Sequence, residues 1–234
     1  MIFTDLYKQS DKQSFINKVN EYSELLGINP NWLMAVMKAE SGLNPQAVNK
    51  QPASVPGYDE DGILIKPAGQ PDAENINVRS LYRATGLIQF MPKTAKGLNT
   101  HTDDLVEMSG TEQLYYVYKY YQPYKGKIKS YFDLYLVTFF PVAIGKPDNW
   151  TFETSKIKAS TIARQNPGID LNKDDKITIA EFKGYLLKTI PDNLKPFVFG
   201  SAPGNNAGTG EKKNNLIWLY LAAIGIFLYF NRRK

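Results

Sequence analysis

Residues 29–41, NPNWLMAVMKAES, constrain the fold more than any other part of the chain. The segment opens with Asn-Pro, which is typical of a helix N-cap followed by proline in the first helical position. At helical spacing Glu40 shares its face with three apolar residues, which are Leu33, Val36 and Met37. Burial raises the pKa of a carboxyl group, and a general acid needs a raised pKa to keep its proton near neutral pH. The alternative is a glutamate that turns out to solvent from the last turn.

Helical patterns recur on both sides of this segment. Residues 15–26 carry apolar side chains at helical spacing, and Gly27 follows as a helix end. Further helices are expected after Pro92, over 111–121 and over 179–189, and residues 131–144 form a strongly apolar segment. We therefore expect a mainly α fold.

Residues 50–80 have a different composition. They hold four prolines, several glycines and the acidic run 59–61, and such a composition predicts a long loop with a short hairpin around Asp61-Gly62. Long ordered loops in compact domains are often functional, and the alternative is a solvated surface insertion.

Composition excludes several kinds of chemistry. The chain has no cysteine, which rules out disulfides, thiolate nucleophiles and cysteine-bound zinc. His101 is its single histidine, which argues against a Ser-His-Asp site. The net charge of +5 favours polyanionic partners, but the charge is spread out and no nucleic-acid-binding motif is present. Fifteen tyrosines suit both a packed core and the binding of sugars.

Two short motifs stand in the order that one enzyme family uses. The first motif, AESGLNP at residues 39–45, and the second motif, GLIQFMP at residues 86–92, resemble the two main signatures of the soluble lytic transglycosylase (SLT) family. The resemblance covers roughly residues 15–145 and is closest to phage-encoded members. It implies a lysozyme-like α-helical fold and the cleavage of peptidoglycan glycan strands.

The resemblance also implies roles for single residues. Glu40 would protonate the glycosidic oxygen between N-acetylmuramic acid and N-acetylglucosamine, and would then act as a base on the muramyl 6-hydroxyl to give a 1,6-anhydro product. No cofactor is needed for this reaction. Ser41 matches a serine that orients the glutamate or the substrate, or it only caps the helix. Gln89 matches a glutamine near the substrate groove, or it shapes the local turn.

The chain departs from the family pattern at a later helix. Relatives commonly show Ala-Tyr-Asn-x-Gly, whereas the counterpart here is Thr138-Phe139-Phe140-Pro141. The tyrosine hydroxyl and the asparagine amide are therefore missing at those positions. Tyr135 or a residue of the tyrosine-rich helix could substitute as a substrate-binding group.

Residues 170–181, called the acidic loop below, fit the calcium loop of an EF-hand. Oxygen ligands at alternate positions and a final glutamate match what a hard cation requires. The expected ligands are Asp170, Asn172, Asp174, the carbonyl of Lys176, Thr178 through a water, and Glu181. Asp175 stands where glycine is usual. A bound calcium would be structural, and the alternative is an acidic turn that caps the next helix.

The end of the chain reads as a linker and a membrane anchor. Residues 200–215 have the composition of a flexible linker, and residues 216–230 are an uninterrupted apolar run flanked by cationic residues. The run is somewhat short for a hydrocarbon core of about 30 Å. The start of the chain lacks the pattern of a signal peptide, so we expect a virion with an internal membrane, or the host cell membrane, as the location.

These observations predict four segments and one function. The segments are a lysozyme-like transglycosylase domain (1–149), an EF-hand-like helical segment (150–199), a linker (200–215) and a transmembrane helix (216–230). The expected partners are peptidoglycan, a lipid membrane and other virion proteins, with action at phage entry or release. One rival is a hydrolytic lysozyme that takes a second carboxylate from residues 59–61. The other is a non-catalytic, membrane-anchored wall-binding or virion structural protein.

Overall fold

The computed structural model describes residues 1–49, 57–58, 64–66, 83–155 and 157–200. Helices dominate this part of the chain, as the sequence predicts. The α-helices are α1 (Lys12–Leu26), α2 (Pro30–Ser41), α3 (Pro92–Gly97), α4 (Thr102–Glu107), α5 (Gly110–Tyr121), α6 (Tyr131–Phe139), α7 (Ala159–Gln165), α8 (Ile179–Thr189) and α9 (Lys195–Phe199). Short 3-10 helices are η1 (Thr4–Leu6), η3 (Gln122–Tyr124), η4 (Pro141–Ala143) and η5 (Asp192–Leu194).

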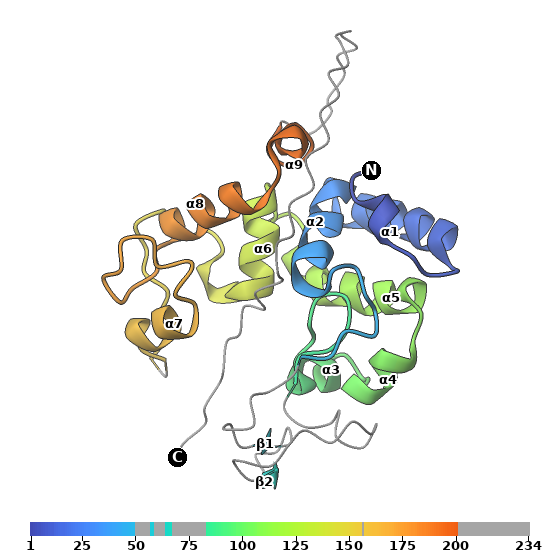
Figure 1. The fold of residues 1–234 in the computed structure, drawn as a ribbon, viewed down its shortest axis with the longest axis horizontal. Helices are drawn as coiled ribbons and strands as arrows, with labels where there is room; N and C mark the ends of the chain where they lie inside the picture. Colours follow the sequence, from blue (N-terminus) through green and yellow to red (C-terminus); the bar gives the residue numbers. More distant parts are fainter. Residues whose placement is uncertain (50–56, 59–63, 67–82, 156, 201–234) are drawn as a thin grey trace, which may run out of the picture.

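Helix α2 is the central element of the fold. Figure 1 shows it between α1 on one side and α6 on the other, and it contacts α1, α6 and α9. Six consecutive residues, Trp32 to Met37, are buried, so the helix is enclosed around its whole circumference. A helix of this kind belongs in a core. Its C-terminal end, with Glu40, is therefore held at a fixed place in the molecule.

Local signals fix where α2 begins and ends. The Asn29 side chain accepts a hydrogen bond from the Asn31 amide at 2.9 Å, which confirms the predicted N-cap. Gly42 follows the helix at φ 65°, and its amide bonds back to the carbonyl of Lys38. This left-handed end turns the chain sharply after Ser41.

The second motif forms a tight turn next to that end. Thr85 and Phe90 exchange two backbone hydrogen bonds of 2.8 and 3.0 Å, which closes the loop between them. Gly86 adopts φ 80°, and its amide donates to the carbonyl of Ala47 at 2.8 Å. This bond joins the second motif to the segment that follows the first motif.

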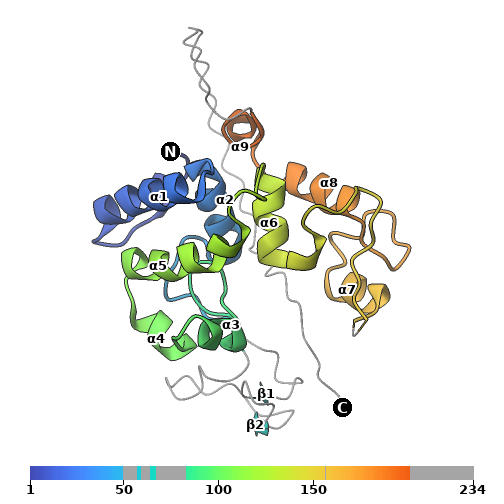
Figure 2. The same cartoon turned by 180° about the vertical axis from the view of Figure 1, so that it is seen from behind.

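Helices α7 and α8 lie on the side of α6 away from α1, as both views show (Figures 1 and 2), and α9 contacts α2. An aromatic cluster joins residues 150–199 to α6, and its rings lie 5.1 to 5.7 Å apart between centroids. Its members are Tyr135, Phe139, Phe140, Phe152 and Phe182. These residues belong to the same buried core as α2, so the segment is an integral layer of the fold.

Two features at the edges of the fold remain. Strands β1 (Gly57–Tyr58) and β2 (Leu64–Lys66) pair antiparallel on either side of the expected Asp61-Gly62 turn. Within the described residues, no helix has the length and apolar character needed to cross a membrane. The expected linker from residue 201 onward and the expected transmembrane helix at 216–230 lie outside the described residues.

Candidate active site

A cleft of about 370 Å³ opens beside the C-terminal end of α2. Its walls include residues of the second motif, α3, α5, η3, α6 and η4. The lining residues are Glu40, Ala84, Ile88, Gln89, Met91, Thr94, Tyr120, Tyr124, Thr138, Phe139, Phe140, Pro141, Val142 and Thr154. Glu40 is the one carboxylate among them, and most of the other groups are apolar or aromatic.

Glu40 combines a desolvated carboxyl group with access to this cleft. Burial raises the pKa of its carboxyl from 4.5 to about 7, and a hydrogen bond from Tyr135 opposes part of that increase. Glu40 also stands in the last turn of α2, where the negative end of the helix dipole disfavours a second negative charge. A carboxyl group in this setting holds its proton close to neutral pH, as a general acid requires.

Tyrosines surround Glu40 on its protein side. Burial raises the pKa of five tyrosines on three helices, and the charge of Glu40 adds to the rise in each of them. They are Tyr120, Tyr121, Tyr131, Tyr135 and Tyr185. All five stay protonated at neutral pH and act as neutral neighbours. In the described part of the chain, no cationic side chain contributes to the pKa of Glu40. Nothing there offsets the cost of burying its charge except the Tyr135 hydroxyl.

Ser41 joins the two motifs. Its hydroxyl lies 2.9 Å from the carbonyl oxygen of Met37 and 3.0 Å from that of Leu87, and it can donate to either. The residue does not line the cleft. Its contact with the Met37 carbonyl fits the expected capping role, and its contact with the Leu87 carbonyl adds a link to the second motif.

Gln89 lines the cleft and also shapes the turn. Its side-chain amide donates to the carbonyls of Gly86 at 3.0 Å and Ala47 at 3.3 Å. Its own backbone adopts φ 54°, a left-handed conformation that a non-glycine residue holds only when its surroundings compensate. Both roles expected for this residue are compatible with its position.

Gln113 on α5 is a residue whose importance the sequence does not reveal. It is fully buried, and its side chain bonds to three backbone groups, which are the amide of Leu87 and the carbonyls of Pro45 and Leu105. Gly86 must be glycine here, because a Cβ atom would stand 2.5 Å from the Gln113 Oε1 atom. Gln113 therefore fixes the second motif relative to the first.

One wall of the cleft departs from the family pattern. Phe139 and Phe140 line it where relatives commonly carry tyrosine and asparagine. Thr138 also lines the cleft, and its hydroxyl lies 2.6 Å from that of Tyr121. From the tyrosine-rich helix, Tyr120 reaches the cleft, whereas Tyr115 is about half exposed elsewhere. The family pattern has a tyrosine hydroxyl at the position of Phe139, which this chain lacks. Here Glu40 receives a hydrogen bond from the hydroxyl of Tyr135.

The acidic loop uses its side chains to hold its own backbone. Asp170 accepts hydrogen bonds from the amides of Asp174 and Asp175, and Glu181 accepts from the amides of Leu171 and Thr178. Asp175 adopts φ 62°, the turn for which glycine is usual. Among the described residues, no group of three or more His, Cys, Asp or Glu side chains is placed to hold a metal. Calcium binding therefore stays a prediction.

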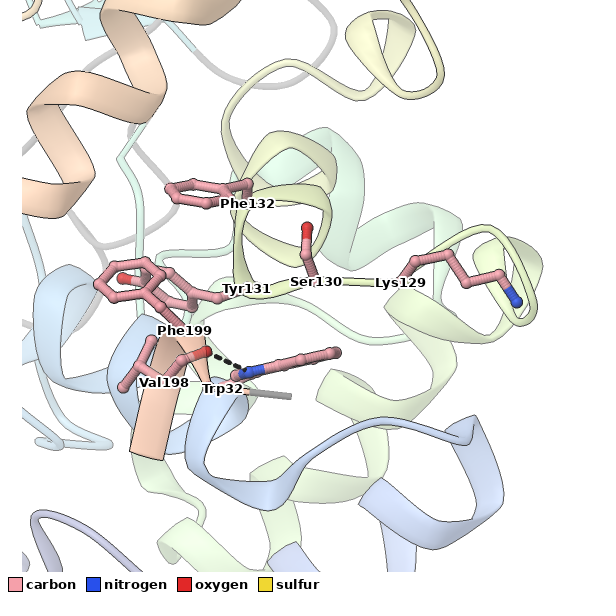
Figure 3. Close-up of a pocket in the computed structure, with 8 residues that line it drawn as sticks. Trp32, Lys129, Ser130, Tyr131, Phe132, Val198 and Phe199 are labelled. Atoms are coloured by element: carbon pink, nitrogen blue, oxygen red, sulfur yellow. Dashed lines mark hydrogen bonds between the residues drawn. The ribbon is translucent and has the colours of Figure 1, made fainter. Parts of the chain in front are cut away.

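A second, smaller cavity of about 200 Å³ lies between α2, the start of α6 and α9. Figure 3 shows aromatic rings from all three helices around it, with the side chain of Lys129 extending away from them. The indole N–H of Trp32 donates to the carbonyl of Val198 at 2.8 Å, which ties α9 to α2 (Figure 3). The described residues that line this cavity include no carboxylate.

A single acid at the end of a buried helix, facing an aromatic cleft, is suited to general acid–base cleavage of a polymer that fits the cleft. Residues 17–131 match the family described as the Transglycosylase SLT domain, which assigns this segment of the chain to that family. The family match implies transglycosylase activity on peptidoglycan. No curated protein and no solved structure matches the chain.

The family match has a limit that bears on the site. It covers α2, the second motif and α5, and it ends at Tyr131, the first residue of α6. Glu40, Ser41 and Gln89 lie inside it. Tyr135, the Phe139-Phe140 wall and Thr154 lie beyond it.

Proposed function

We propose that the chain cleaves the bond between N-acetylmuramic acid and N-acetylglucosamine in peptidoglycan and leaves a 1,6-anhydromuramyl end. The observation that carries this proposal is the Glu40 carboxyl group, which lines the cleft and has its pKa raised by burial to about 7. A group with this pKa is present in both protonation states near neutral pH, and the proposed reaction uses both.

The reaction needs two proton transfers at one carboxyl group. Protonated Glu40 gives its proton to the glycosidic oxygen as the bond from that oxygen to the muramyl C1 breaks. The resulting carboxylate then takes the proton of the muramyl 6-hydroxyl as its oxygen bonds to C1. The substrate supplies the nucleophile, so no water is added and Glu40 is protonated again at the end.

A hydrolytic lysozyme would need a different site. Glycosidases commonly use a pair of carboxyl groups on either side of the scissile bond. In the described part of the cleft, Glu40 is the one carboxylate among the lining residues. The residues expected to supply a second one, 59–61, lie outside the described residues. The transglycosylase reaction needs Glu40 alone, because the substrate supplies the nucleophile.

Mass spectrometry of products from purified sacculi tests the proposal. The full-length chain is compared with Glu40→Gln, which keeps the shape of the side chain and removes the acid. Anhydromuramyl ends from the unsubstituted chain alone are the expected result. Reducing ends would identify a hydrolytic lysozyme. No release of products by a folded chain would favour the wall-binding alternative, which the Phe139-Phe140 departure from the family pattern supports.

We also propose that residues 216–230 anchor the enzyme in a membrane and that it acts at phage entry or release. Support comes from the apolar run and its cationic flanks in the sequence. Partition of the full-length chain into vesicles, compared with a chain that ends at residue 200, tests the anchor. Absence of the protein from virions and from the membranes of infected cells would contradict the proposed location.

A further inference from the structure

Glu40 receives its side-chain hydrogen bond from Tyr135, which lies beyond the segment that the family match covers. Tyr135 is 2% exposed and is not among the residues that line the cleft. Its hydroxyl therefore meets the Glu40 carboxyl group from the protein side and has no access to a bound glycan. This placement differs from the substrate-binding role expected from the sequence.

Packing holds the Tyr135 ring in one orientation. Tyr131 lies edge to face with it at a centroid distance of 5.8 Å and an interplanar angle of 88°. Phe182 of α8 packs in the same manner at 5.7 Å and 76°. Aromatic pairs of this geometry are favourable, and a ring enclosed on two sides cannot move without disturbing both neighbours. The hydroxyl of Tyr135 is thus preorganised.

The helical period of α6 explains why Tyr135 and Phe139 differ in role. Residues four apart lie on the same face of a helix, one turn above the other. Phe139 reaches the cleft, and Tyr135 lies one turn earlier beside the carboxyl group. A hydroxyl at position 139 would point into the cleft. The one at position 135 instead lies behind the acid.

We propose that Tyr135 is the positioning residue of Glu40: its hydroxyl holds one oxygen of the carboxyl group, so that the other faces the glycosidic oxygen in the cleft. This inference rests on the function proposed above. Helix α8, through Phe182, then supports the catalytic acid although it contributes no residue to the cleft. The segment 150–199 is part of the catalytic framework.

The electrostatic surroundings of Glu40 make the contribution of Tyr135 measurable. The titratable groups that interact with Glu40 in the described residues are tyrosines of α5 (Tyr120, Tyr121), α6 (Tyr131, Tyr135) and α8 (Tyr185). Of these, Tyr135 alone lowers the pKa of Glu40, because its hydroxyl donates to the ionised form. Removing that hydroxyl should raise the pKa further.

The test is Tyr135→Phe in the full-length chain, which removes one oxygen and keeps the ring. Tyr7→Phe is the matched control, because the Tyr7 hydroxyl is also buried, donates to a carboxylate (Asp11, 2.7 Å) and lies outside the cleft. Two readouts are needed. One is the carbon-13 chemical shift of the Glu40 carboxyl group against pH, and the other is the pH profile of kcat for release of anhydromuropeptides.

For Tyr135→Phe we expect the pKa of Glu40 to rise by about one pH unit, with the alkaline limb of the kcat profile moving equally. The plateau of kcat should fall about tenfold, and KM should change little, because Tyr135 does not touch substrate. Tyr7→Phe should lower Tm without moving the pKa. An unchanged pKa and kcat in Tyr135→Phe would overturn the proposal. If no chain releases product, the proposed function fails, and the carboxyl titration still decides whether Tyr135 holds Glu40.

Discussion

Replacing Glu40 by glutamine should make the protein more stable at alkaline pH while abolishing its activity. The Glu40 carboxyl has a pKa of about 7 in the folded chain and 4.5 as its ordinary value. The folded chain therefore binds this proton more tightly than the unfolded chain does. The free energy of unfolding should fall as pH rises from about 4.5 to 7, and it stays lower at higher pH.

The size of this effect follows from the difference between the two pKa values. A difference of about 2.5 pH units corresponds to roughly 3.4 kcal/mol, at 1.36 kcal/mol for each unit. Because Glu40 lines an open cleft, solvent reduces this figure, and about 1–3 kcal/mol is the expected range. Glutamine carries no titrating group. The substituted protein should match the original near pH 4 and exceed its stability by that amount near pH 8.

Urea unfolding at a series of pH values between 4 and 8 measures the effect, with the slope m checked for constancy. Glu112→Gln is a control of opposite sign. Hydrogen bonds from Ser109 lower the pKa of Glu112, so its replacement should reduce stability at neutral pH and have less effect in acid. The claim that Glu40 is desolvated would be refuted by either of two results. Glu40→Gln could be no more stable than the original protein at pH 8, or its gain in stability could be equal at pH 4 and pH 8.

Two further predictions concern the frame of the site, and a third concerns the acidic loop. Gln113→Leu should lower the free energy of unfolding by about 3 kcal/mol or more, measured by urea unfolding, because three buried backbone groups lose their partner. Gly86→Ala should cost about 1–3 kcal/mol by the same assay, and a double-mutant cycle should show strong coupling to Gln113, because the added Cβ meets its side chain. Excess calcium should raise Tm if the acidic loop binds it, and should not do so in Asp170→Asn. An unchanged Tm would exclude a calcium site there.

The helices were predictable because their ends carry local signals. The Asn-Pro start of α2 and the apolar stripe of α5 depend on residues a few positions apart, and both helices lie within a residue of where the sequence places them. The same holds for α8, which begins at Ile179 as expected. Glu40 could be singled out for the same reason, since its helical face is a local property.

The partners of Glu40 could not be predicted, because they come from distant parts of the chain. Tyr135 is one of fifteen tyrosines, and nothing near it in sequence marks it as the one beside the acid. Gln113 appears as an ordinary polar residue of an amphipathic helix until its three backbone partners are seen. Thr154 reaches the cleft from the segment beyond α6, far from Glu40 in the sequence.

Two opposing effects set the pKa of the Glu40 carboxyl group. An enzyme with one acid must donate a proton and then recover one, so its group works best with a pKa near the operating pH. Burial at the end of α2 moves the pKa of Glu40 upward, and the Tyr135 hydroxyl limits that rise. Without burial the carboxyl would be ionised and unable to start the reaction. Without the hydroxyl it would hold its proton too strongly to act as a base in the second step. Glu40 is buried at the end of α2, inside the segment that matches the family, whereas Tyr135 lies beyond that segment. The proposed reaction requires both the burial and the hydrogen bond.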